Sequence, residues 1–179
     1  MNINSRNIYI IYILLYFSLL IGFYFNEDFA LGYIGDYHGG KQFVYLFEKD
    51  LVKTLLNFDK FTTSHSPIYY IFFAFLEKIS FNETVSRLIN LHLSLFIPYF
   101  FYLCLKLKYK FQKEDLRTLI PCVIFFSPYF RSSSIWISSE NISLLFLIIS
   151  FYFFLKYEFD KEKNFSNIFL NVFFLACAA

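Results

Sequence analysis

Long apolar runs alternate with short polar stretches along this chain. The first run, Ile8 to Phe25, contains 18 residues and no charged side chain. A helix rises 1.5 Å per residue, so a run of about 20 apolar residues can cross a hydrocarbon core about 30 Å thick. The pattern therefore predicts membrane-spanning helices at about 8–25, 88–105, 116–130, 142–156 and, incomplete, 165–179.

A long polar segment, residues 26–87, separates the first two predicted spans and contains two helical patterns. The pattern in 43–57 has large apolar residues at four-residue intervals, namely Phe43, Phe47, Leu51 and Leu55. It predicts an amphipathic helix suited to a membrane surface. Pro67 stands at a favourable first position of a second helix, at about 67–79, which at roughly 20 Å is too short to cross a bilayer. We expect the first helix to be interfacial and the second to be re-entrant or interfacial.

Composition strengthens the membrane interpretation and narrows the class of partner. Hydrophobic residues make up 58% of the 179 residues, whereas soluble domains contain about 45–50%. The 28 Phe and 15 Tyr are interpreted as apolar surface rather than as a stacking site. A net charge of only +2 argues against a nucleic-acid partner. The expected fold is an all-α polytopic transmembrane helical bundle, with interfacial helices in a long first outer loop.

The two ends of the chain also carry expectations. The first apolar run is longer than the core of a typical signal peptide, and no small-residue cleavage site follows it, so we expect an uncleaved first span. The last run, 165–179, stops without a basic flank. We therefore expect the chain to be the N-terminal part of a longer polypeptide and to be inactive on its own.

The positions of basic residues orient the predicted spans. With the N-terminus in the cytoplasm, nine Lys or Arg fall in three short cytoplasmic stretches, and seven are spread over the longer outer side. The positive-inside rule then favours a cytoplasmic N-terminus. We expect a bacterial inner-membrane protein with the loop 26–87 and a short polar turn, 131–141, on the periplasmic face.

The most informative candidate for chemistry is Asp36, which lies in a polar stretch directly after the first span. Gly35, Gly39 and Gly40 surround it and would allow tight turns and a close approach of the backbone to a ligand. Partial shielding from water can raise the pKa of such a carboxyl toward that of a useful general base. The alternative is a solvated loop acid. His38 could pair with Asp36 or form half of a metal site, but no second histidine nearby has metal-ligand spacing, so no metal ligand is assigned.

Other polar residues on the same side of the predicted membrane extend this candidate site. His65 precedes a helix whose amide groups could hold an anion, or it caps or packs that helix. Lys41, Arg87 and Arg131 could each hold a lipid phosphate or anchor the chain at the interface. Glu140 begins the fourth span and is either a second acid of the site or a helix cap.

Several residues are expected to have structural roles instead. The three cysteines lie in apolar runs without CxxC spacing and are interpreted as packed or lipid-facing thiols: Cys104, Cys122 and Cys177. His92 lies inside the second span and is expected to be hydrogen-bonded between helices. Glu27 and Asp28 are interpreted as ordinary interfacial charges.

Taken in order, these pieces resemble the N-terminal part of a GT-C-type membrane glycosyltransferase. That superfamily includes the protein mannosyltransferases, the lipid A aminoarabinose transferase and the dolichyl-phosphate-glucose glucosyltransferases. The matching pieces are a first-loop acid, a His-x-Pro element, an Arg-Leu element that opens the second span, a Ser-Pro element and a second-loop acid. In this chain they are Asp36, His65-Ser66-Pro67-Ile68-Tyr69-Tyr70, Ser86-Arg87-Leu88-Ile89-Asn90, Ser127-Pro128-Tyr129-Phe130-Arg131 and Glu140. Relatives often have Asp-Glu at the first acid, where this chain has Asp36-Tyr37, and some have a pair of acids in the second loop.

The resemblance implies an enzyme that moves a sugar, with inversion, from a polyprenyl-phosphate donor to a hydroxyl of a glycan, lipid or protein acceptor. Asp36 would be the general base, Arg87 or a lysine would steady the phosphate, and Glu140 would orient a substrate. The substrate-binding candidates are Arg87, His65, Lys41, His38 and Arg131. No cofactor is certain, and the resemblance leaves room for a divalent metal ion. Two alternatives stay open: a transporter or flippase for lipid-linked cargo, which predicts acids inside the spans where none is found, and a non-catalytic membrane subunit.

Overall fold

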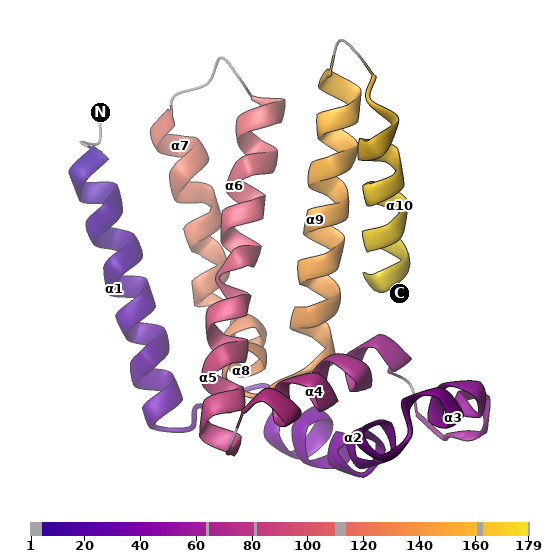
Figure 1. Cartoon of the computed structure of the whole chain (residues 1–179). Helices are drawn as coiled ribbons and strands as arrows, with labels where there is room; N and C mark the ends of the chain where they lie inside the picture. The colour runs from indigo at the N-terminus through magenta and orange to yellow at the C-terminus, as the bar shows by residue number, and fades with distance from the viewer. Residues whose placement is uncertain (1–4, 64, 81, 110–113, 161–162, 179) are drawn as a thin grey trace.

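The computed structural model describes residues 5–63, 65–80, 82–109, 114–160 and 163–178. Within these ranges every regular element is a helix, as the apolar pattern predicts. Figure 1 shows a bundle of helices that run side by side, and a layer of shorter helices that lies across one end of it. The elements in chain order are α1 (Ser5–Tyr24), η1 (Tyr33–His38), α2 (Gly39–Lys49), α3 (Leu51–Leu56), η2 (Phe58–Lys60), α4 (Pro67–Ile79), α5 (Glu83–Ser94), α6 (Phe96–Lys108), α7 (Glu114–Leu119), η3 (Ile120–Phe126), α8 (Pro128–Ile135), α9 (Ser139–Phe159) and α10 (Phe165–Ala178).

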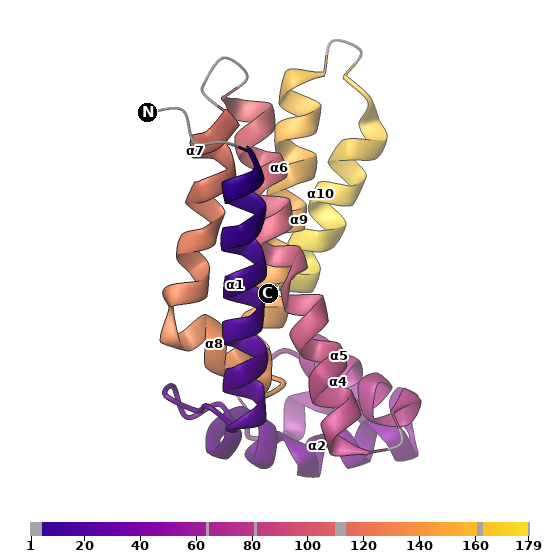
Figure 2. The same ribbon diagram turned by 90° about the vertical axis from the view of Figure 1, so that its left-hand side faces the viewer.

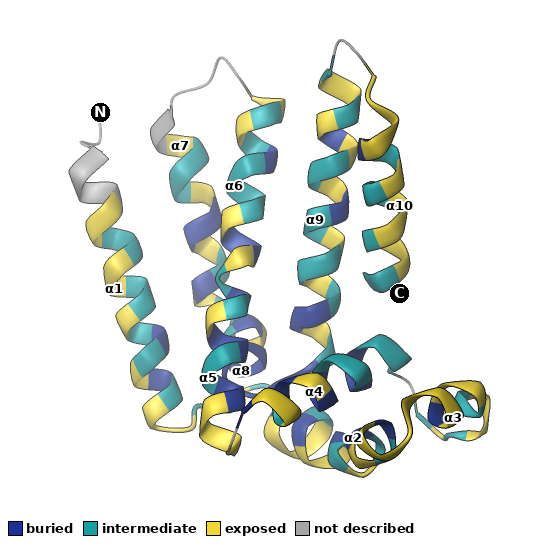
Figure 3. Cartoon of the chain, in the orientation of Figure 1, coloured by how far each residue is buried: buried dark blue, intermediate teal, exposed yellow. Residues whose placement is uncertain are grey.

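Two helices of the bundle are long and apolar enough to cross a membrane. They are Glu83–Lys108, which joins α5 and α6, and Ser139–Phe159, which is α9. Only 17% of the most apolar window of α9 is buried, and exposed positions continue along the outer faces of the bundle (Figure 3). This exposed apolar surface indicates association with a membrane. Three apolar helices are shorter (Tyr9–Tyr24, Leu116–Phe126 and Phe165–Ala178), and their role as spans stays a prediction.

The layer is formed by α2, α3 and α4, and the perpendicular view in Figure 2 shows α2 and α4 at the same end of the bundle, opposite the start of α1. Its helix boundaries follow local sequence signals. Ser66 accepts a hydrogen bond from the backbone amide of Ile68 at 3.2 Å, and Pro67 follows as the first helical residue of α4. The predicted helix at 67–79 is confirmed. Asn82 caps α5 in the same way, because its side chain accepts from the amide of Val85 at 2.9 Å.

Two predicted elements differ from the structure. The single helix expected at 43–57 is instead α2 and α3, because Asp50 between them is extended (φ −157°, ψ 92°) and its side chain caps α3. The turn expected at 131–141 is wrong in its first half, where α8 forms behind a Ser127 cap and Pro128. Ser127 and Pro128 are favourable residues for the cap and first turn of a helix, and the apolar pattern alone does not indicate this helix start.

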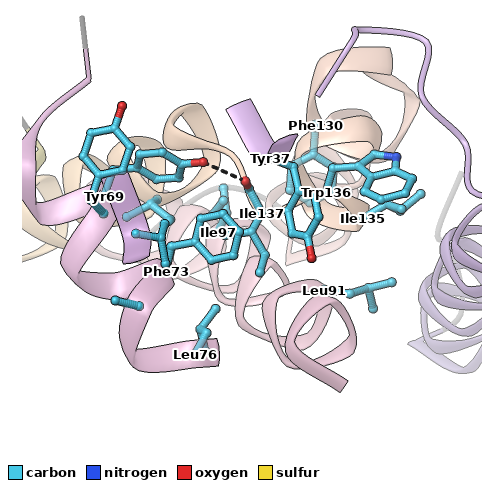
Figure 4. Close-up of a cluster of buried hydrophobic side chains, with 14 of the residues drawn as sticks. Tyr37, Tyr69, Phe73, Leu76, Leu91, Ile97, Phe130, Ile135, Trp136 and Ile137 are labelled. Carbon is cyan, nitrogen blue, oxygen red and sulfur yellow. Dashed lines mark hydrogen bonds between the residues drawn. The ribbon is translucent and has the colours of Figure 1, made fainter. Parts of the chain in front are cut away.

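The densest core lies where the layer meets the bundle. Fully buried side chains gather around α8, α4 and the adjoining ends of α5 and α9, whereas farther along the bundle partly exposed residues predominate (Figure 3). Figure 4 shows this cluster, with Tyr37 of η1, Tyr69 and Phe73 of α4, and Trp136 and Ile137 after α8. The layer is therefore packed onto the bundle by a shared core, and residues on both sides of this junction are held in fixed positions.

Buried amides add polar contacts to the same junction. The side-chain amide of Asn141 in α9 donates to the hydroxyls of Ser94 in α5, at 3.1 Å, and Ser134 in α8, at 2.8 Å. Asn90 in α5 donates to the carbonyls of Ser133 and Ser134, at 3.1 and 2.9 Å. These bonds connect α5, α8 and α9 close to the start of α9. They also give the buried amides hydrogen-bond partners, without which their burial would be costly.

Candidate functional site

The carboxylate of Asp36 is the centre of a polar cluster at the junction between layer and bundle. One oxygen, Oδ2, accepts hydrogen bonds from the backbone amide and the hydroxyl of Ser139, at 3.0 and 3.1 Å. The other, Oδ1, lies 3.3 Å from Nε2 of His65. The Asp36 side chain is 12% exposed and that of His65 is 26% exposed. Asp36 thus meets the first residue of α9 and the segment before α4.

Tyr69 contacts the backbone of two segments that meet at this cluster. Its hydroxyl lies within hydrogen-bonding distance of two carbonyls, Asp36 O at 3.0 Å and Ile137 O at 3.1 Å, and Figure 4 shows the bond to Ile137. The Tyr69 side chain needs space beside Gly40, where a Cβ atom would lie 3.2 Å from the hydroxyl. Gly40 therefore serves close packing. The tight turns expected from the glycines are not formed, because Gly35 lies within η1 and Gly39 and Gly40 begin α2.

Glu140 lies beside Asp36 at the start of α9. The hydroxyl of Ser138 donates to its Oε2 at 2.6 Å, and the Glu140 residue is exposed at the surface. Burial raises the pKa of Asp36, and the adjacent Glu140 carboxyl raises it further, whereas the Ser139 amide and His65 lower it. Two neighbouring carboxyls resist being ionised together, so the pair can hold one shared proton. This makes the pair suited to proton transfer.

The structure brings together three of the residues that the sequence singled out, Asp36, His65 and Glu140. Residues 36, 65 and 140 come from separate segments, and helix packing alone makes them neighbours. Ser138, Ser139 and Tyr69 also belong to the cluster and were not predicted from the sequence. The only available signal was their place next to named motifs, because Tyr69 follows the His-x-Pro element and the serines precede Glu140.

Arg87 does not join this cluster. Its guanidinium donates to the carbonyl of Ile135 at 3.1 Å and to the Asn26 side chain at 2.9 Å, and its Cζ lies 3.4 Å from the centroid of the Trp136 ring. The side chain is 8% exposed. Arg87 therefore joins α5 to the segments after α1 and α8.

The other three candidates also lie outside the cluster. Arg131 binds both carboxylate oxygens of Glu27, at 2.6 and 2.5 Å. Glu27 is 12% exposed, so its interpretation as an ordinary interfacial charge is wrong. Lys41 contacts Glu83 on another side of the layer, and His38 is an exposed residue whose ring lies 5.9 Å from that of Tyr33.

The expected structural residues are mostly in packed positions. His92 shares a hydrogen bond of 2.9 Å with the hydroxyl of Tyr16, so the interhelical role predicted for it is confirmed. Cys104 and Cys122 are buried free thiols, and Cys177 is half-buried. Asp28 accepts a hydrogen bond from Ser132 at 2.7 Å and so contacts α8.

The divalent metal ion that the resemblance leaves room for stays a prediction. Among the residues that the structure describes, no three His, Cys, Asp or Glu side chains are grouped to hold a metal ion. Comparison of the chain with protein-family models, with curated proteins and with solved structures finds no match.

Proposed function

We propose that the protein is a membrane glycosyltransferase of the GT-C type, which uses a polyprenyl-phosphate-linked sugar as donor and a hydroxyl as acceptor. One observation carries the proposal: Asp36, His65 and Glu140 meet at the junction of the layer with α9, a helix apolar enough to cross a membrane. A lipid-linked donor lies in the bilayer and a polar acceptor lies outside it. A polar site at this boundary is accessible to both.

Asp36 is suited to be the general base. Its carboxylate would take the proton of the acceptor hydroxyl while the hydroxyl oxygen attacks the anomeric carbon. The bond from that carbon to the phosphate oxygen would break, and the polyprenyl phosphate would leave with the electron pair, which inverts the anomeric centre. A raised pKa makes Asp36 a stronger base than an ordinary aspartate, provided that it is ionised at the working pH.

The neighbouring groups can orient this step. The Ser139 amide and hydroxyl hold Oδ2, so Oδ1 is the oxygen that faces His65 and the part-exposed side of the cluster. The imidazole of His65 lies beside Asp36, and we assign it the leaving phosphate in place of Arg87 and Arg131, whose guanidinium groups are bound within the fold. Glu140, exposed at the edge, would orient a sugar hydroxyl.

The substitution Asp36→Asn tests the assignment. Membranes that contain the full-length protein, as wild type or variant, would be incubated with radiolabelled polyprenyl-phosphate hexoses, and label in extracted glycan, lipid and protein would be counted. We expect a loss of about 10² to 10⁴ in transfer rate, which is the contribution of a general base. Asparagine can still accept the hydrogen bonds of Ser139, so α9 should keep its capping interaction.

Asp59→Asn is the matched control, because Asp59 is an exposed acid of the same layer. It should transfer label at the wild-type rate. If Asp36→Asn also retains wild-type transfer while inserting normally, Asp36 is not the base and the proposal fails.

A further inference from the structure

Tyr70 of α4 is buried in a group of aromatic rings inside the layer. It is 1% exposed. Its ring centroid lies 5.1, 6.2 and 6.1 Å from those of Phe43, Phe47 and Phe58. A phenylalanine would fill the same space among these rings, so apolar packing explains the ring of Tyr70 and leaves its hydroxyl group unexplained.

The hydroxyl of Tyr70 is connected to His65 through Thr63. The oxygen of the Tyr70 hydroxyl lies 2.5 Å from Oγ1 of Thr63. The same Oγ1 atom accepts a hydrogen bond from the backbone amide of His65 at 3.2 Å. A threonine oxygen has two lone pairs and one hydrogen, so it can make both bonds at once. The polar end of Tyr70 therefore holds the backbone of a residue in the cluster around Asp36.

The ring of His65 depends on this backbone for its position. Its Nε2 lies 3.3 Å from Oδ1 of Asp36. Its centroid lies 5.4 Å from that of Tyr69 and 6.2 Å from that of Tyr70, in edge-to-face contacts. The side-chain cap of α4 comes from Ser66, so His65 is free to turn toward Asp36. A shift of the His65 backbone would move the imidazole away from all three neighbours.

We propose that Tyr70 is a positioning residue, which acts through Thr63 to hold the imidazole of His65 against Asp36. The buried aromatic rings fix Tyr70, and its hydroxyl passes this fixed position on to the segment before α4. Tyr70 is buried and acts only through Thr63, so it is not a catalytic residue. The proposal rests on the transfer proposed above, because that reaction gives His65 its role at the leaving phosphate.

Histidine NMR tests the positioning without requiring transfer. The whole chain, labelled with nitrogen-15 histidine and held in detergent micelles, would be compared as wild type, Tyr70→Phe and Thr63→Val. The spectrum of His65→Gln assigns the signals of His65. We expect both variants to move the Nε2 signal of His65 most of the way to its position in Asp36→Asn, because the imidazole loses its contact with the carboxylate. Thr63→Ser keeps the hydroxyl and should retain the wild-type signal.

A double variant tests whether Tyr70 acts through Thr63. Tyr70→Phe added to Thr63→Val should move the signal no further than Thr63→Val alone, because both changes break one chain of hydrogen bonds. Thr62→Val is the matched control, since Thr62 is the exposed neighbour of Thr63, and it should leave the signal in place.

The midpoint of thermal unfolding checks that each variant is folded. A folded Tyr70→Phe with the wild-type signal of His65 overturns the proposal, and so do additive shifts in the double variant. If Tyr70→Phe does not fold, the comparison of Thr63→Val with Thr63→Ser decides, and equal signals in these two variants overturn the proposal.

Transfer by the full-length protein separates the positioning of His65 from the proposed function. Tyr70→Phe and Thr63→Val should lower kcat with a polyprenyl-phosphate hexose by about tenfold to a hundredfold, because a small displacement of a reacting group is costly. Thr63→Ser should retain most of the rate. A His65 signal that moves while transfer continues at the wild-type rate supports the positioning and overturns the role proposed for His65 in the reaction. A lower rate with an unmoved signal overturns the positioning.

Discussion

At the scale of single residues, the carboxylate of Asp36 has both a structural and a chemical role. It accepts the amide of Ser139 and so caps α9 from a distant segment, which a purely structural acid would also do. It also faces His65 and lies beside Glu140, contacts that a helix cap does not need. Experiments on this residue therefore have to separate capping from proton transfer.

The pH dependence of sugar transfer separates the capping role of Asp36 from its role as a base. Glu140 raises the pKa of Asp36, so Glu140→Gln should lower it. A base acts only when deprotonated, and its activity rises as pH rises through its pKa. We therefore expect the acidic limb of the kcat/KM profile to move to lower pH in Glu140→Gln, measured with the labelled-donor assay.

Glu158→Gln, an exposed acid at the far end of α9, is the control and should leave the profile in place. An unchanged acidic limb in Glu140→Gln would show that the two carboxyls do not act as a pair. A fall in rate at every pH, without a shift, would point to substrate orientation alone.

Single residues were partly predictable from the sequence. Asp36, His65 and Glu140 stood out because charged or titratable side chains next to apolar runs are costly unless they have a use. The partners of Arg87 and Arg131 could not be predicted, because Ile135, Asn26 and Glu27 become their neighbours only after the helices pack. The positive charge of these arginines indicated that they need hydrogen-bond acceptors. It did not indicate which residues supply those acceptors.

At the scale of helices, α1 is joined to α8 by polar contacts as well as by apolar packing. Arg131 of α8 binds Glu27 just after α1, and also the hydroxyl and carbonyl of Ser18 within α1, each at 3.1 Å. Gly22 leaves room for the Glu27 carboxylate against the helix, where a Cβ atom would collide with it. A mostly buried ion pair with these extra hydrogen bonds fixes where α1 sits.

Breaking one side of this pair should weaken the fold. We expect Arg131→Met to lower the free energy of unfolding by about 3 kcal/mol, because Glu27 would be left charged, largely buried and without its partner. The measurement is denaturant unfolding in micelles, followed by circular dichroism. Adding Glu27→Gln to Arg131→Met should restore part of the loss.

Lys156→Met, an exposed cation of α9, should change the free energy of unfolding by less than about 1 kcal/mol. If Arg131→Met costs no more than this control, the pair is not what holds α1 in place.

Helix existence was easier to predict than helix ends. The long apolar runs predicted α1, α5 with α6, α9 and α10, and the Ser66-Pro67 signal predicted the start of α4. The split between α2 and α3 depends on Asp50, whose extended backbone interrupts an otherwise continuous amphipathic pattern. Because an aspartate fits either a helix surface or a cap, periodicity could not decide between them.

At the scale of the whole molecule, the layer lies at one end of the bundle and the start of α1 at the other (Figure 1). Asp36 and Glu140 belong to the layer end, in agreement with the sequence prediction that they share a side. The side of the membrane on which this end lies stays a prediction, because it depends on the distribution of basic residues.

Labelling from the two sides of a membrane tests the arrangement. In a background without cysteines, Asp59→Cys in the layer and Glu158→Cys at the far end of α9 would be treated with a membrane-impermeant maleimide. We expect labelling from opposite sides, with Asp59→Cys accessible from the periplasmic side. Both residues are exposed, so access to the reagent does not require unfolding.

Labelling of both positions from the same side would show that α9 does not cross the membrane. Labelling of Asp59→Cys from the cytoplasm alone would keep the fold and reverse its orientation.

The chain contains a single tryptophan, so its intrinsic fluorescence reports on the surroundings of one residue. Trp136 is 5% exposed, stacks on Arg87, donates its indole N–H to the carbonyl of Glu27 at 3.1 Å and lies near Tyr33 and Tyr37. Its fluorescence spectrum therefore reports on a single place, the seam between the layer and the bundle. Detachment of the layer would expose the indole to water and shift the emission toward the red. Detachment can thus be followed in unlabelled protein.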